Sequence, residues 1–263
     1  HTSVHRQDDR HGSSHLLSRR WFIALTAFYI VVGLLWTAVC ANWAASALNA
    51  DSYVPIALLA FGFAMIGAVA SARAESSVGS LFGFAMMATG LGVICGPALA
   101  LYSLGSILLA LLGTTLVVVV LGLVGALIPA SLEGWWPYLM WATLMLVFGL
   151  LLVPSLIATG FLGAGAMGGL SWAVLLVFSL WVVYDLNRAM ALERNYRNAA
   201  DVAAAIYLDF LNIFLSILDL FGSAGSGIKG WWNDGDSGSS SGGGKPDGWF
   251  GRGSGSGGSW LDW

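Results

Sequence analysis

Two aspartates interrupt the last two apolar stretches of this chain, and they are the residues best suited to chemistry. Asp209 lies inside the apolar run Ala203–Phe221, and Asp185 ends the preceding run. A carboxylate at membrane depth is costly, so it usually marks an ion or proton path. Two carboxylates in contact cannot both ionise freely and titrate as one coupled unit. The pair therefore predicts a proton-sensitive latch or an oxygen-rich site for a hard cation such as Ca²⁺.

The last apolar run carries a single polar stripe. At 100° per residue, four polar side chains fall within an arc of about 80°; they are Asp209, Asn212, Ser216 and Asp219. Lipid does not accept such a stripe, so we expect it to face protein or a water-filled cavity. The simplest arrangement places this helix at the centre of a bundle, ringed by the six others.

Composition indicates a polytopic all-α membrane protein. Hydrophobic residues make up 57% and charged residues 10% of the 263 residues, whereas soluble domains carry about 25% charged residues. Seven continuous apolar runs are long enough to cross a bilayer as helices, which favours helices over an alternating barrel. The predicted spans are Trp21–Ala44, Val54–Ala72, Val78–Leu99, Ser103–Ile128, Pro137–Ile157, Gly168–Leu186 and Ala203–Phe221.

The charges divide the chain into a membrane body and two polar tails. Residues 21–221 carry only 12 of the 25 charged residues. The segment 1–20 contains four His and four Arg, and the segment 222–263 is rich in Gly, Ser and Trp. We interpret both as solvated tails, although the four histidines could hold a metal and the tryptophans could touch the membrane or a partner.

Loop charge predicts the orientation. With the N-terminus cytoplasmic, the inside segments carry eight Lys or Arg and the outside loops carry none, as the positive-inside rule requires. We therefore expect an integral protein of the plasma (inner) membrane. A net charge of −3, without a basic stripe, predicts no nucleic-acid partner.

Depth makes contact between the two acids feasible. Asp209 is six residues beyond Ala203, about 9 Å into the membrane from the cytoplasmic side, and Asp185 ends its span on that side. Two alternatives stay open: Asp185 could pair with Arg188 one turn on, and Asp209 could make a purely structural hydrogen bond. Arg73, which ends the second span, could pair with the acids or extend to the interface.

The segment Tyr184–Gly222 is similar to the C-terminal signature of the Bax inhibitor-1 family, in its prokaryotic-type members. The matching positions are Tyr184, Asp185, Tyr196, Ala204, Tyr207, Leu208, Asp209, Asn212 and Phe214. The run 76–99 also resembles the third span of that family. The resemblance implies a central seventh helix and a pH-sensitive calcium leak that is gated by a di-aspartyl pair at Asp185 and Asp209. It also implies an arginine latch on the second span, for which Arg73 is an approximate match.

Three functions are compatible with these residues. The first is a proton-gated leak in which Ca²⁺ permeates, without any cofactor. The second is a non-conducting regulator that binds another membrane protein, such as a membrane protease. The third is an intramembrane aspartyl protease, because Tyr184–Asp185 resembles its YD motif. However, the second acid lies in YLD without a preceding glycine that would open the helix. We therefore expect the leak channel and no enzymatic activity.

Overall fold

The computed structural model describes residues 17–48, 50–163 and 165–222, and within them it contains helices and no strands. The elements are α1 (Arg19–Ala47), α2 (Ala50–Arg73), α3 (Ser77–Leu99), α4 (Leu104–Leu127), the short 3-10 helix η1 (Glu133–Trp135), α5 (Trp136–Ala158), α6 (Gly165–Ala191) and α7 (Tyr196–Phe221). All seven α-helices are long and apolar enough to cross a membrane. The predicted all-α fold class is confirmed, and most of both predicted tails lies outside the described residues.

The last two helices extend beyond their predicted spans, which moves both acids. α6 continues to Ala191, so Asp185 lies about one and a half turns before its end. α7 begins at Tyr196 because the Asn195 side chain caps it, accepting a hydrogen bond from the Asn198 N–H at 2.8 Å. Asp209 therefore lies about 20 Å from Tyr196 along the helix axis, near the middle of α7.

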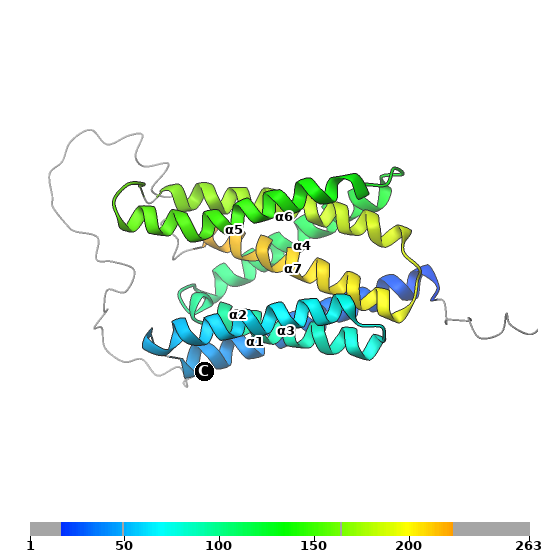
Figure 1. Cartoon of the computed structure of the whole chain (residues 1–263), viewed down its shortest axis with the longest axis horizontal. Coiled ribbons are helices and arrows are strands. Elements are labelled where there is room, and N and C mark those ends of the chain that lie inside the picture. Colours follow the sequence, from blue (N-terminus) through cyan, green and yellow to red (C-terminus); the bar gives the residue numbers. More distant parts are fainter. Residues whose placement is uncertain (1–16, 49, 164, 223–263) are drawn as a thin grey trace, which may run out of the picture.

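α7 is the most enclosed helix. In Figure 1, α4 and α7 lie between the group α1, α2 and α3 and the pair α5 and α6. α7 packs against α1, α2, α3, α4 and α6. Within its most apolar stretch of 18 residues, 61% is buried inside the bundle. The expected central position is confirmed.

The expected ring of six helices needs one correction, at α5. This helix packs chiefly on α6 and η1. Within its most apolar stretch of 18 residues, only 6% is buried inside the bundle. The hydroxyls of Thr143 and Ser155 bond to carbonyls of α5 itself, so its surface presents little that lipid would reject. α5 can therefore remain outside α6.

Tyr207 fixes the rotation of α7 about its axis. Its side chain is fully buried, its hydroxyl lies 2.5 Å from the Thr37 hydroxyl of α1, and its ring packs edge-on against Phe84 of α3 at 5.2 Å. Asp209 follows two residues later and so points about 200° away from Tyr207. Anchoring Tyr207 toward α1 and α3 therefore turns Asp209 toward α6.

Close approach of α4 to α6 depends on Gly125. A Cβ atom at this position would overlap the carbonyl oxygen of Val183 on α6. Small residues permit this kind of backbone contact in membrane bundles. The contact holds α6 beside α4 two residues before Asp185.

Candidate functional site

The structure brings Asp185 and Asp209 together in the bundle interior. Asp185 of α6 is 7% exposed and Asp209 of α7 is 4% exposed. Their carboxyl groups lie close enough to interact with each other. A hydrogen bond between two carboxyl groups requires a proton on one of them, because an ionised carboxylate only accepts. A pair placed in this way is able to share one proton.

Asp209 is the member of the pair with fewer other partners. Its Oδ2 atom is buried and has no N–H or O–H donor among the described residues. Unsatisfied buried polar atoms are rare and require an explanation. A carboxyl group that holds the shared proton, or that binds a water molecule or cation in another state, provides one.

Arg188 belongs to the end of the same interface at which a turn joins α6 to α7. Its Nη2 lies 3.9 Å from Oδ2 of Asp201 on α7, and its charge also acts on Asp185. The alternative pairing of Asp185 with Arg188 one turn on is therefore not the ion pair that forms. Both partners are partly exposed, so this bridge contributes little to stability.

A second polar contact closes the opposite end of the interface. Oδ2 of Asp219 accepts a hydrogen bond from the Ser171 hydroxyl of α6 at 2.5 Å. Tyr102, in the turn between α3 and α4, lies near the same carboxylate; burial and this carboxylate raise the pKa of Tyr102, so the phenol stays neutral. The sequence reasoning missed Ser171 and Tyr102. The signal that could have identified them is a hydroxyl-bearing residue within or next to an apolar span.

Three polar contacts thus follow one α6–α7 interface from end to end. Along α7 they involve Asp201, Asp209 and Asp219, spaced by about 12 Å and 15 Å at 1.5 Å per residue. Between them, the Asn212 amide donates to the Leu208 carbonyl and the Ser216 hydroxyl donates to the Asn212 carbonyl. These two groups bond to their own helix and not across the interface.

Asn187 positions the inner end of α6 and was also missed. Its Nδ2 donates to the carbonyls of Gly125, Ile128 and Ala130, and its Oδ1 accepts from the Leu132 N–H. It therefore ties the segment after α4 to α6 just beyond Asp185. The signal in the sequence that could have identified Asn187 is its position two residues after Asp185, an acid within an apolar span.

Arg73 is not brought to the pair. It is exposed at the end of α2, and within the described ranges it makes no ion pair with either acid. In the same part of the chain, no group of three or more His, Cys, Asp or Glu could hold a metal ion. Asp185 and Asp209 therefore have no third His, Cys, Asp or Glu beside them that would complete such a group. The four histidines at residues 1–15, considered as an alternative metal site, lie outside the described residues.

Comparison with known proteins identifies the family of this chain. The family described as "Inhibitor of apoptosis-promoting Bax1" matches residues 19–226, which includes all seven membrane helices. Uncharacterized proteins from two strains of Helicobacter pylori, 26695 and J99, are each 40% identical to this chain over 47 residues. That segment covers 18% of this chain and only 20% of each relative. On the match that spans its whole helical body, this chain belongs to the Bax inhibitor-1 family of integral membrane proteins.

Proposed function

We propose that this protein is a proton-controlled calcium leak channel whose gate is the Asp185–Asp209 pair. The observation that carries the proposal is the buried contact between two carboxyl groups on adjacent membrane helices. Acids at this depth are rare outside ion and proton pathways. The protein performs no covalent chemistry in this proposal and requires no cofactor.

The shared proton holds the closed state. With one proton on the pair, a hydrogen bond joins α6 to α7 and a single negative charge remains. Loss of that proton at higher pH places two like charges in contact, which costs about 4 kcal/mol at ~4 Å and an effective dielectric constant of ~20. Separation of α6 from α7, or entry of a cation between the carboxylates, relieves this repulsion.

Calcium is the ion that suits this interface. Ca²⁺ accepts flexible oxygen coordination from carboxylates, carbonyls and water, whereas Mg²⁺ requires near-ideal octahedral geometry and loses water reluctantly. Because only two carboxylates would coordinate the calcium ion, the pair would bind it weakly and let it pass. Asp201 and Asp219 would provide acidic positions on either side of Asp209 along the route.

The test is flux through the purified full-length protein in liposomes that contain a calcium-sensitive dye. We expect Ca²⁺ entry that increases from about pH 6 to about pH 8 and exceeds Mg²⁺ entry under the same gradient. Protein-free liposomes are the control. Absence of flux at every pH, together with stable association with another membrane protein, would favour the non-conducting regulator instead.

We further propose that the ends of the bundle nearest Arg188, Arg194 and Arg197 face the cytoplasm of a cell whose plasma (inner) membrane holds the protein. A cysteine at the exposed position Glu193, in a background without Cys40 and Cys95, should resist an impermeant maleimide in intact cells. A cysteine at exposed Leu101, at the other end, should react. The reverse labelling pattern would reject this orientation.

A further inference from the structure

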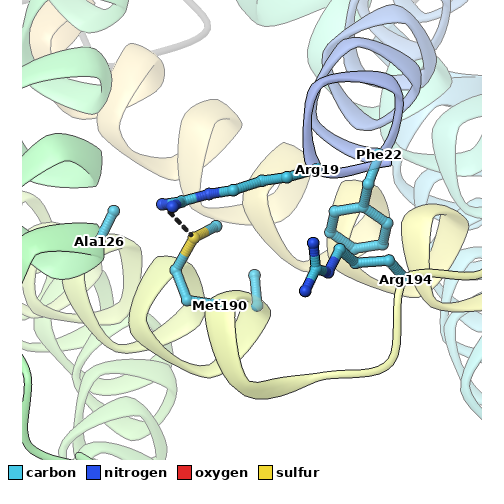
Figure 2. A pocket seen from close by; sticks show the side chains of 6 residues that line it. Arg19, Phe22, Ala126, Met190 and Arg194 are labelled. Atoms are coloured by element: carbon cyan, nitrogen blue, oxygen red, sulfur yellow. Dashed lines mark hydrogen bonds between the residues drawn. The ribbon is translucent and has the colours of Figure 1, made fainter. Parts of the chain in front are cut away.

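A small cavity lies at the inner end of the bundle, away from the acid pair. It is lined by Arg19, Phe22, Ala126, Ala189, Met190 and Arg194, and its volume is about 160 Å³. Figure 2 shows the Arg19 side chain reaching across it from α1 toward Met190 of α6, with the Arg194 guanidinium beside Phe22. Three helix ends and the α6–α7 turn therefore meet around two cations.

Both arginines lack an anionic partner. The guanidinium of Arg19 donates to the Met190 sulfur at 3.5 Å, which is a weak acceptor. Within the described ranges, no carboxylate lies at ion-pair distance from Arg19 or Arg194, whereas Arg188 bridges Asp201 and Arg197 donates to the Ala74 carbonyl at 2.7 Å. Arg19 and Arg194 thus present two positive charges that no carboxylate among the described residues neutralises at ion-pair distance.

The frame around these arginines is rigid. The Leu17 N–H donates to the Arg194 carbonyl at 2.6 Å, which fastens the start of α1 to the α6–α7 turn. Phe22 is 2% exposed and packs in a buried cluster with Ala189 and Ala199. Arg19 is the first residue of α1, where the helix dipole also favours an anion. The backbone that carries the two arginines is therefore fixed by contacts between α1 and the α6–α7 turn.

We propose that Arg19 and Arg194 form a binding site for a phosphate group. Guanidinium groups bind phosphate oxygens in a bidentate manner, and basic pockets between membrane helices bind anionic lipid headgroups. The volume of about 160 Å³ equals roughly five water molecules, enough for a phosphate with part of a headgroup. The apolar walls formed by Phe22, Ala126 and Met190 suit a group at the border between lipid and water. The phosphate comes from an anionic phospholipid or from free phosphate in solution.

Native mass spectrometry of the full-length protein separates these two sources. The protein is incubated in mixed micelles that contain phosphatidylglycerol or phosphatidylcholine, and inorganic phosphate is titrated by calorimetry in parallel. Arg19→Gln and Arg194→Gln should each weaken binding by about tenfold or more, as expected for a lost charge-assisted hydrogen bond. Arg20→Gln removes the same charge from the next position, outside the cavity, and is the matched control. Arg19→Lys should restore part of the affinity.

The outcomes are distinct. Retained phosphatidylglycerol that depends on both arginines and resists millimolar phosphate identifies the lipid headgroup as the ligand. Phosphate that gives arginine-dependent heat and displaces the lipid identifies free phosphate. Equal losses in Arg19→Gln and Arg20→Gln, or binding of neither probe, would overturn the proposal. Arg194→Gln, in a turn, and Arg19→Lys keep the test valid if Arg19→Gln does not fold. None of these readouts requires calcium flux, so the site stands or fails independently of the proposed channel.

Discussion

Asp209→Asn is the substitution that most directly tests the proton latch. The amide has the shape of the protonated carboxyl group and can donate a hydrogen bond to Asp185, so the closed contact between α6 and α7 is kept. It cannot ionise, so the second negative charge never appears. Repulsion of about 4 kcal/mol between two carboxylates at ~4 Å corresponds to a change of about a thousandfold in a two-state equilibrium. The flux of the wild type can therefore change with pH by at most about a thousandfold. We expect the flux of Asp209→Asn to be low and almost independent of pH.

The assay compares calcium entry into liposomes at several values between about pH 6 and about pH 8, a range in which isolated Asp and Glu side chains remain ionised. Glu75→Gln is the matched control, because it also converts a carboxylate to an amide, and Glu75 is exposed beyond the end of α2. Its flux should follow the wild-type curve. Thermal stability of Asp209→Asn should equal or exceed that of the wild type, since an unsatisfied buried acid is removed. A wild-type pH midpoint in Asp209→Asn, or an equal loss in Glu75→Gln, would refute the latch.

Three further predictions concern the surroundings of the pair. Asp185→Asn should flatten the pH response but leave a residual leak, measured in the same liposomes, because Asp209 remains as an acidic ligand. Gly125→Ala should lower the midpoint of thermal unfolding, since the added methyl group overlaps the backbone of α6 at a cost of about 1–3 kcal/mol; Gly62→Ala, whose added methyl group meets nothing within 4 Å, should not. Tyr102→Phe should leave the pH midpoint of flux unchanged: burial and the Asp219 carboxylate raise the pKa of Tyr102, so its phenol is neutral across the whole assay range.

Patterns within single helices were readable from the sequence alone. Seven apolar runs of sufficient length predicted seven membrane helices, and all seven are present. The stripe from Asp209 to Asp219 predicted that the last helix lies inside the bundle, because helical periodicity places those side chains on one side and lipid does not accept such a stripe. Chain direction and the positions of the two spans indicated that contact between Asp185 and Asp209 is feasible, and the resemblance to the family implied the pair.

Contacts between helices required the tertiary structure. Hydropathy does not register capped, polar first turns, so the start of α7 was predicted at Ala203 and lies at Tyr196. The choice of Asp201 as the partner of Arg188, and of Ser171 and Tyr102 as partners of Asp219, depends on how each helix is rotated and crossed against its neighbours. The convergence of Arg19 and Arg194 has the same origin. These residues are far apart in sequence, and only the packing of α1 against the α6–α7 turn brings their charges to one place.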